Sequence, residues 1–487
     1  MIMYLIAYPI ITAIYLAWQP TEGGANPEQA TGITLTMAMA SSQTLRYMVC
    51  LMLLATDPWG AMEYHEFIGI GAPLLFGVDY TSMLLVTLSC FLVEPMVLAL
   101  ADTPHASQKA QLALVFLATA LINAAFTTTD YIVFYVAFEA VLMPLYVMVG
   151  LYGGSPTRVR SALLLFLYTL AGSLFMLLGI LGLYSHTGTT DMTVLHHVSL
   201  DPAVQRYLFV CFGLALMVKT PIVPFHIWLP RAHADAPLPG SMLLAGTVLK
   251  LATYGVYRLV LPVLPDACDY YAPLVQTLAV VSLIYSSLAT LRSVDTKQLI
   301  AYSSVGHMAV VVLGLFSNSV IGISGALLLS LAHGLISPAL FVMVGGVLYN
   351  RYHTRSISYY RGMASVMPVF TVVFFFAICA NMGVPLSVNW VGEFMALAGV
   401  MEQSFLACAL GATGIVLSAC YSTWLWARIS AGTLSPYLTI AGDLTRTEAM
   451  TVLPLIIMTL FLGVIPGVLL SGLEVEASAL LYSVPTV

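Results

Sequence analysis

The stretch that decides the fold is residues 218–258, which read VKTPIVPFHIWLPRAHADAPLPGSMLLAGTVLKLATYGVYR. It places two prolines, Pro221 and Pro224, directly after Lys219 at the end of an apolar run. A proline has no backbone N–H, so each one leaves a carbonyl group without its helical partner. Such backbone is tolerated at membrane depth only where protein or a wet cavity surrounds it. The stretch therefore predicts an interrupted membrane helix, followed by a helix that carries a second lysine, Lys250.

The composition of the whole chain agrees with a membrane environment. Of its 487 residues, 60% are hydrophobic and only 8% are charged, whereas a soluble domain carries about 25% charged residues. This excludes a soluble globular protein, a disordered chain and a nucleic-acid binder. The seven cysteines are scattered without a CxxC pair, and no nucleotide-binding motif occurs. We therefore expect no metal and no cofactor in this chain.

Hydropathy predicts an all-α polytopic membrane protein with about fourteen spans, since a bilayer takes about 20 apolar residues per helix. The candidate helices are 2–18, 32–55, 80–101, 110–127, 131–151, 160–184, 205–227, 239–262, 271–291, 298–316, 319–349, 366–399, 405–427 and 450–471. Residues 57–78 contain too many glycines and prolines for a span, and we interpret them as an interfacial loop. Asp79 and Asp130 stand at predicted helix starts and are expected to cap them.

The basic residues test this helix count. With Met1 on side A, eleven lysines and arginines fall on side B: Lys109, Arg158, Arg160, Arg231, Arg292, Lys297, Arg351, Arg355, Arg361, Arg428 and Arg446. Only Arg206 and Arg258 fall on side A. The positive-inside rule then places side B at the cytoplasm or matrix. Both termini are expected on the opposite side, which is the intermembrane space or the periplasm.

A second interruption is predicted at residues 381–385, which read Asn-Met-Gly-Val-Pro inside the candidate helix 366–399. Broken helices in the two halves of a chain are the usual pointer to inverted repeats in transporters. We therefore predict two inverted five-helix repeats, helices 4–8 over 110–262 and helices 9–13 over 271–427. Residues 1–109 would hold the first three helices, and 428–487 a loop and the last helix.

Six ionisable side chains are candidates for function because they fall well inside the predicted spans: Glu139, Lys219, Lys250, His307, His333 and Glu393. A charge at the centre of a bilayer costs at least about 2.5–3.5 kcal/mol on insertion scales, so each one needs a partner or a function. A lysine and a carboxylate with adjustable separation can switch between charged and neutral forms, as a gated proton relay requires. A lone histidine is often structural, and a single Lys–Glu pair can merely fix helix packing. We do not expect all six residues to be structural, because the free-energy costs of burying them add up.

The sequence also resembles a known family, the antiporter-like membrane subunits of respiratory complex I. The resemblance rests on residues 218–258 and on FYVAFEAVLMPLY, FLYTLAGSLFMLL, DTKQLIAYSSVGHM, SLAHGLISPALF and NWVGEF. The AHADAPLPGSM segment is closest to the chain 4 branch of this family. The resemblance covers about residues 79–448. A departure is Gln298, where many relatives carry a second basic residue.

The resemblance implies a proton-translocating role, driven by quinone reduction elsewhere in the complex. It implies that Glu139 is the carboxylate of the fifth helix, Lys219 the lysine of the broken helix and Lys250 the connecting lysine. His307 and His333 would continue the relay to Glu393, the acid on the exit side. FMN, iron–sulfur clusters and ubiquinone would be bound by other subunits.

The resemblance also implies partners and a location. Neighbouring antiporter-like subunits, accessory subunits and phospholipids such as cardiolipin are the expected partners. The mitochondrial inner membrane is the expected location, with a bacterial plasma membrane as the alternative. Two rival functions stay open: a subunit of a multisubunit sodium/proton antiporter, and a structural subunit of the membrane arm that does not pump.

Overall fold

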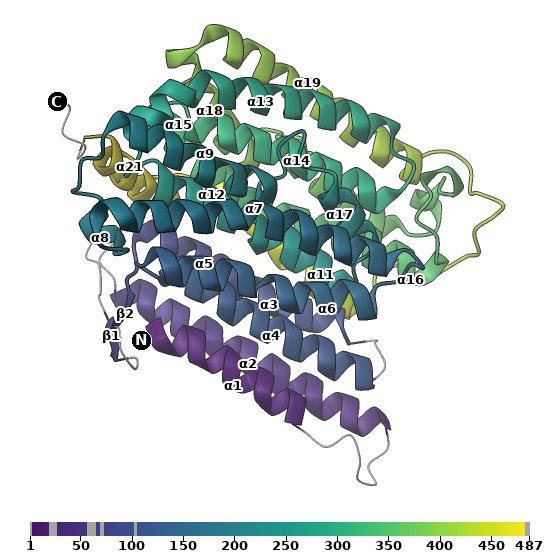
Figure 1. The fold of residues 1–487 in the computed structure, drawn as a ribbon. Helices are drawn as coiled ribbons and strands as arrows, with labels where there is room; N and C mark the ends of the chain where they lie inside the picture. Colours follow the sequence, from purple (N-terminus) through teal and green to yellow (C-terminus); the bar gives the residue numbers. More distant parts are fainter. Residues whose placement is uncertain (1, 19–26, 56–64, 69–72, 102–104, 483–487) are drawn as a thin grey trace. The chain divides into compact units, whose positions relative to one another are not determined.

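The computed structural model describes residues 2–18, 27–55, 65–68, 73–101 and 105–482, and nearly all of them are helical (Figure 1). Within these residues, eleven helices are long and apolar enough to cross a membrane, and α1 (Ile2–Trp18) and α17 (Pro368–Asn381) are shorter apolar helices. The prediction of an all-α polytopic membrane protein is therefore confirmed. The total of fourteen spans and the inverted repeats stay predictions.

The chain divides into two compact units. Among the described residues, unit 1 contains those up to 219 and 235–268, and unit 2 contains 220–234 and 269–482. The chain thus leaves unit 1 directly after Lys219, contributes fifteen residues to unit 2, and returns at Asp235. The first predicted interruption is the point where the chain changes units.

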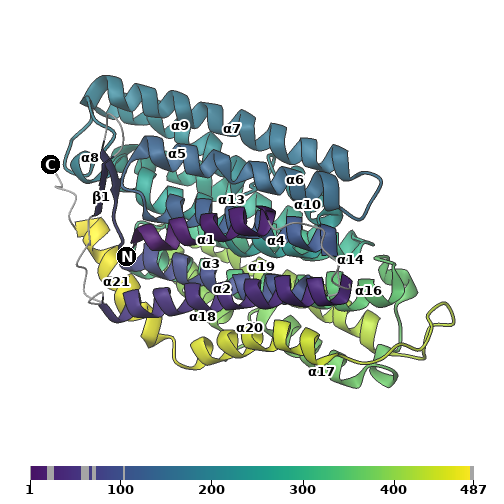
Figure 2. The ribbon, with the colours of Figure 1, turned by 90° about the horizontal axis from the view of Figure 1, so that it is seen from below.

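Unit 1 is a bundle of helices with a small hairpin. Its elements are α2 (Pro27–Ala55), β1 (His65–Ile68), β2 (Pro73–Phe76), α3 (Tyr80–Ala99), α4 (His105–Thr127), α5 (Tyr131–Ala140), α6 (Leu142–Tyr152), α7 (Arg158–Thr187), α8 (Met192–Leu195), α9 (Pro202–Lys219), α11 (Leu238–Leu243), η1 (Leu244–Val248), α12 (Leu249–Gly255) and η2 (Val256–Val260), besides α1. The first four helices lie side by side in Figures 1 and 2. The hairpin β1–β2 is antiparallel and lies in the predicted interfacial loop, of which 57–64 and 69–72 fall outside the described residues.

Polar groups fix the ends of several helices in unit 1. Asp130 caps α5 as predicted, accepting hydrogen bonds from two backbone N–H groups of its first turn. Asp79 stands at the N-cap position of α3, but its side chain makes no capping bond and instead pairs with Arg258. Its predicted capping role is therefore wrong, because a buried guanidinium is the stronger partner for a carboxylate.

Unit 2 is also predominantly helical in its described residues. Its elements are α13 (Pro265–Arg292), α14 (Thr296–Leu315), α15 (Val320–Phe341), η3 (Val342–Leu348), α16 (Tyr349–Tyr352), η4 (Ile357–Tyr359), η5 (Met363–Ser365), α17, α18 (Val388–Gln403), α19 (Phe405–Ser430), α20 (Arg446–Val464) and α21 (Gly467–Tyr482), with α10 (Trp228–Asp235) from the inserted segment. The helix α15 is buried from Gly322 to Phe341 and packs against α14, α17, α18, α20 and α21. The core of unit 2 therefore surrounds α15.

Both predicted interruptions are confirmed, since α9 ends at Lys219 and α17 ends at Asn381, six residues before α18 begins. Two predicted helices are less continuous than expected. The helix predicted over 131–151 is present as one span, Tyr131–Tyr152, with a single irregular residue at Val141 between α5 and α6. Pro144 contributes to this irregularity because it cannot bond to the carbonyl four residues earlier. The helix predicted over 450–471 ends at Val464 before Pro466, and α21 follows it as an additional helix.

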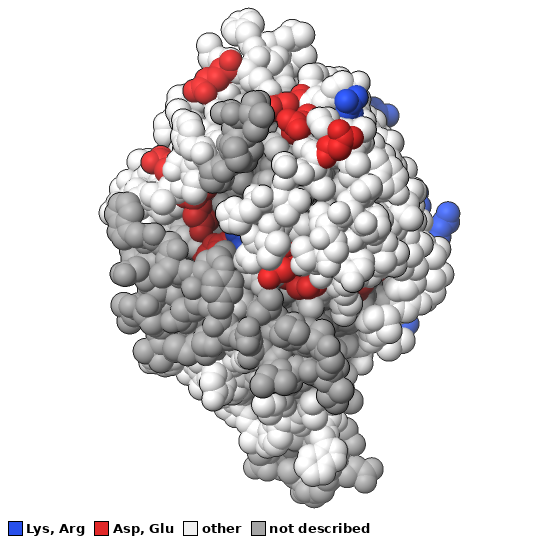
Figure 3. Space-filling model, turned by 60° about the vertical axis from the view of Figure 1, so that its left-hand side comes forward, with Lys and Arg blue, Asp and Glu red and all other residues white. Residues whose placement is uncertain are grey.

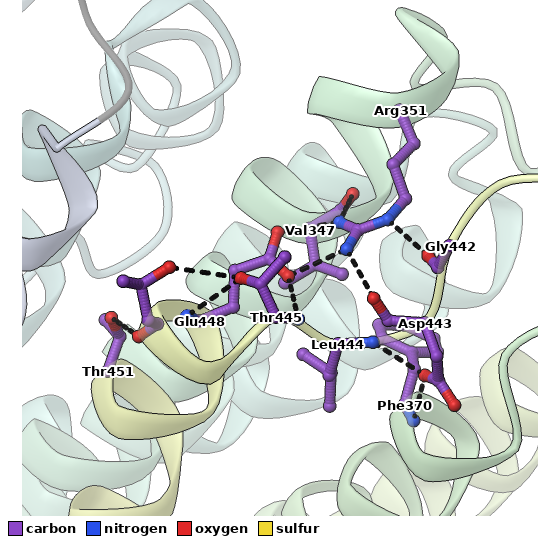
Figure 4. Close-up of polar contacts among 10 residues, drawn as sticks. Val347, Arg351, Phe370, Gly442, Asp443, Leu444, Thr445, Glu448 and Thr451 are labelled. Atoms are coloured by element: carbon purple, nitrogen blue, oxygen red, sulfur yellow. Dashed lines mark hydrogen bonds and ion pairs between the residues drawn. The ribbon is translucent and has the colours of Figure 1, made fainter.

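Hydrogen bonds from Arg351 hold the loop before α20 in unit 2 (Figure 4). Arg351 donates two hydrogen bonds of 2.7 Å to the carboxylate of Glu448 and further bonds to the carbonyls of Gly442 and Asp443. The Asp443 carboxylate in turn accepts from the backbone N–H of Phe370 in the first turn of α17. One arginine thereby ties the end of α16 to the starts of α17 and α20.

Charged groups are sparse on the face shown in Figure 3, where small acidic patches interrupt a white surface. Lys109 and Lys297, both assigned to side B, are buried within their units at 6% and 5% exposure. The stem of Lys297 lies against Gly345, where an added Cβ would come within 2.5 Å of the lysine Cε. These lysines bury their stems in protein, as long basic side chains at membrane interfaces do.

Candidate functional site

The six candidate residues fall into two sets, one in each unit. Unit 1 holds Glu139, Lys219 and Lys250, and unit 2 holds His307, His333 and Glu393. Five of the six are at most 4% exposed, and Glu139 is partly exposed. Nearly complete burial of five ionisable groups is costly unless polar partners compensate it.

Lys219 is held by a backbone carbonyl of α5. Its ammonium donates a 2.7 Å hydrogen bond to the backbone carbonyl of Phe138 and lies 3.2 Å from the centroid of the Phe138 ring. Phe138 stands in the last turn of α5, just before Val141 and Pro144, and Pro144 has no N–H to donate to a helix carbonyl. The helix α9 ends at Lys219 because prolines follow it. This end, together with the irregular residue at Val141, places the lysine ammonium on the Phe138 carbonyl.

Glu139 follows Phe138 in the chain, yet it forms no hydrogen bond with Lys219. Its Oε1 atom is buried without a hydrogen-bond partner among the described residues. The lysine therefore bonds to the backbone beside the carboxylate rather than to the carboxylate itself. Because the carbonyl that holds Lys219 belongs to the residue next to Glu139, the arrangement suits a pair with adjustable separation.

Lys250 lies between two π-helical turns, η1 and η2, and is fully buried. Its ammonium donates a 2.5 Å hydrogen bond to the carbonyl of Ala245, five residues earlier in the widened turn. Single π-helical turns inside α-helices occur frequently at functional sites. On the same helix face, the Tyr254 hydroxyl bonds to Ser82 of α3 and to the Phe126 carbonyl of α4. These bonds join the lysine helix to the core of unit 1.

The set in unit 2 is a bonded cluster. His307 of α14 and Glu393 of α18 form a hydrogen bond of 2.9 Å between Nδ1 and Oε1. The His333 ring of α15 lies with its centroid 5.7 Å from that of His307. An imidazole bonded to a carboxylate can pass or accept a proton at either ring nitrogen. The structure thus brings together the three unit 2 residues that sequence alone placed on three separate helices.

The second interruption contributes directly to this cluster. Gly383 has a φ of +70°, a left-handed conformation that glycine adopts without strain. A Cβ at this position would come 2.7 Å from the Oε2 atom of Glu393. The break between α17 and α18 therefore makes room for the carboxylate as well as freeing the backbone.

A small cavity lies beside the His307–Glu393 pair. Its volume is about 10 Å³, close to the space that one water molecule requires. Its polar lining consists of His307, Glu393, Ser287, Ser418 and Tyr421, supplied by α13, α14, α18 and α19. A water in this cavity could exchange protons with the carboxylate.

The described residues contain no group of three or more His, Cys, Asp or Glu side chains that could hold a metal ion. The side chains that the two sets hold are lysine, carboxylate and imidazole groups, which accept and release protons. Sequence reasoning missed Phe138, Gly383 and Tyr421. Gly383 could have been found from the sequence, because it is the only glycine within the predicted break. The roles of Phe138 and Tyr421 could not, because the carbonyl contact of the first and the cavity contact of the second depend on how the helices pack.

Comparison with known proteins places this arrangement in context. A family profile described as "NADH:quinone oxidoreductase/Mrp antiporter, TM" matches residues 128–418. The chain is 47% identical to NADH-ubiquinone oxidoreductase chain 4 of Mycosarcoma maydis, over 99% of this chain and 100% of that relative.

Two solved structures share the fold. A chain of respiratory complex I from Thermus thermophilus with bound NADH is 28% identical, with a TM-score of 0.88 and 99% of each chain covered. A chain of the Mrp complex from Dietzia is 21% identical, with a TM-score of 0.87, covering 99% of this chain and 97% of that chain. At that identity the second likeness concerns the fold alone.

Proposed function

The chain belongs to the NADH:quinone oxidoreductase/Mrp antiporter family of membrane proteins, and from this premise we propose that it translocates protons as the chain 4 subunit of complex I. It is then part of an enzyme, NADH:ubiquinone reductase, without holding a redox centre itself. The relative named above is identical at almost half of all positions over the full chain, which supports this subunit over other family members.

The observation that carries the proposal is the buried His307–Glu393 hydrogen bond beside a second histidine, His333, in the core of unit 2. Two imidazoles and a carboxylate at this depth are expensive for a purely structural role. Proton exchange among them needs no cofactor. The Lys219 ammonium, held on a neutral carbonyl beside Glu139, supplies the corresponding group in unit 1.

In the proposed mechanism, a signal from quinone reduction changes the separation of Glu139 and Lys219. An approaching carboxylate stabilises the ammonium, and its withdrawal favours release of the lysine proton. The proton passes to Lys250, then to His307 and His333, and leaves through Glu393 towards side A. The order of these steps follows the family resemblance, and each residue in it accepts or donates a proton at a nitrogen or carboxylate oxygen.

The remaining parts of the proposal concern the surroundings. Other subunits hold FMN, the iron–sulfur clusters and ubiquinone, and neighbouring antiporter-like subunits, accessory subunits and cardiolipin contact this chain. The mitochondrial inner membrane is the location, supported by relatives from eukaryotes. Both termini face the intermembrane space, because eleven basic residues fall on the opposite side in the sequence-based topology.

The test is NADH-driven proton uptake by vesicles that contain the assembled complex with Lys219→Ala or Glu393→Gln. We expect both variants to assemble and to lose most proton uptake. Arg206→Gln is the control, because this arginine is exposed and lies outside the proposed relay. Normal uptake in both relay variants would support the non-pumping structural rival, and sodium flux without NADH would support the antiporter rival.

A further inference from the structure

The helices α15 and α18 pack against each other along a seam of small residues. A Cβ at Gly399 would lie 2.3 Å from the Cα of Gly322, and a Cβ at Gly392 would lie 2.8 Å from the Cα of Leu329. Midway, a Cβ at Gly325 would lie 2.5 Å from the Cβ of Met395. These contacts show that the two helices are antiparallel. Each residue towards the start of α18 therefore lies opposite a residue equally far towards the end of α15.

The register continues by one turn to Asn389. This residue precedes Gly392 by three positions and so shares its helix face. Because Gly392 lies against Leu329, one further turn places Asn389 at the level of Ala332 and His333 on α15. Asn389 also precedes Glu393 by four positions, one turn along the same helix. It therefore lies between the histidine of α15 and the glutamate of α18.

Asn389 is fully buried at 0% exposure, and neither its amide nitrogen nor its amide oxygen has a hydrogen-bond partner among the described residues. The Nε2 atom of His307 is likewise buried without such a partner. An asparagine amide offers two donors and two acceptor lone pairs, and buried polar groups are nearly always satisfied by protein or ordered water. Three unpartnered atoms on adjacent helices indicate a shared polar ligand.

We propose that Asn389 binds ordered water beside the histidines and is a positioning residue for the protons that reach Glu393. The amide donates to one water oxygen and accepts from a water O–H, which fixes the water's orientation. It does not titrate, so it orders the hydrogen-bonded chain without taking the proton. This inference rests on the proposed proton relay and adds a residue to it.

The test compares three substitutions in the assembled complex in vesicles. Asn389→Leu keeps the approximate volume and removes all hydrogen bonding, and we expect at least a tenfold loss of NADH-driven proton uptake. Asn389→Ser keeps a donor and an acceptor and is expected to recover at least half of the rate. Ser324→Ala is the matched control, because this fully buried hydroxyl on α15 bonds within its own helix. It should leave uptake unchanged.

The outcomes separate this inference from the proposed function. Wild-type uptake in Asn389→Leu, with uptake lost in Glu393→Gln, overturns the role of Asn389 alone. Normal uptake in Glu393→Gln overturns the relay itself. If Asn389→Leu does not assemble, a density map of the wild-type complex decides. Water density within hydrogen-bond distance of the Asn389 amide supports the inference, and an amide bonded only to protein groups overturns it.

Discussion

The set of candidate residues in unit 1 and the set in unit 2 bury their charges in different ways. In unit 1 the Lys219 ammonium bonds to a backbone carbonyl, and the neighbouring carboxylate of Glu139 is left without a hydrogen-bond partner on Oε1. In unit 2 the imidazole of His307 bonds directly to Glu393 at 2.9 Å. The ammonium of unit 1 therefore lies near a carboxylate without bonding to it, whereas the carboxylate of unit 2 bonds directly to an imidazole.

The difference shows what each broken helix contributes. The end of α9 brings Lys219 to the backbone carbonyl of Phe138, which accepts its hydrogen bond without an ion pair. The break between α17 and α18 opens space for a carboxylate beside Gly383. In unit 1, Lys219 can exchange the carbonyl for Glu139 as its partner. In unit 2, a proton can pass within the existing His307–Glu393 hydrogen bond.

The largest expected effect tests the unit 1 set through Lys219→Arg. Arginine keeps the cation and can bond to the Phe138 carbonyl, but it does not release a proton in a protein. We expect NADH-driven proton uptake to fall roughly 100-fold, which corresponds to about 2.7 kcal/mol. Lys219→Met is the companion variant and should be equally inactive. Retained uptake in the arginine variant would mean that proton translocation requires the positive charge at this position but not the release of a proton from it.

A double-mutant cycle on each unit tests the contrast in pairing. Directly bonded groups couple by about 0.5–3 kcal/mol in such cycles, and groups without shared contacts are nearly additive. We expect strong coupling between His307→Gln and Glu393→Gln in the thermal stability of the complex. Glu139→Gln and Lys219→Met should couple less. Equal coupling in both units would remove the distinction drawn between them.

Much of the fold was predictable from the sequence because prolines and charges are costly in an apolar chain. The two breaks, at Lys219 and Asn381, and the burial of the candidate lysines follow from backbone and solvation physics alone. The irregular residue at Val141 was missed although Pro144 was visible, because a proline inside a long apolar run often only bends the helix.

The contacts of the site were less predictable. Nothing in a linear pattern specifies that Lys219 bonds to a carbonyl beside Glu139 rather than to its carboxylate. Nor does spacing along one helix reveal that His307 meets Glu393, which is 86 residues away. Both contacts depend on how helices distant in sequence pack, which the period of a single helix does not encode.

A smaller effect is expected from Gly383→Ala, which tests the space that the break provides for Glu393. The added methyl group would come 2.7 Å from the carboxylate oxygen, and the left-handed backbone costs about 1–2 kcal/mol for a non-glycine residue. We expect about tenfold slower proton uptake. Gly188→Ala is the matched control, because its φ of +73° is similar and no atom lies within 4 Å of the added Cβ. Equal losses in both variants would assign the effect to backbone strain alone.

The smallest expected effect concerns the aromatic face under the Lys219 ammonium. Phe138→Leu removes the ring 3.2 Å from the nitrogen and keeps the backbone carbonyl that accepts its hydrogen bond. A cation–π contact is worth about 0.5–1 kcal/mol at exposed sites and about 2 kcal/mol or more when desolvated. Because the hydrogen bond to the Phe138 carbonyl remains, we expect the change in uptake to be only a few-fold. Phe116→Leu removes a fully buried ring on α4 and serves as the control. A loss as large as that of Lys219→Met would mean that the ring, and not the Phe138 carbonyl, holds the lysine in place.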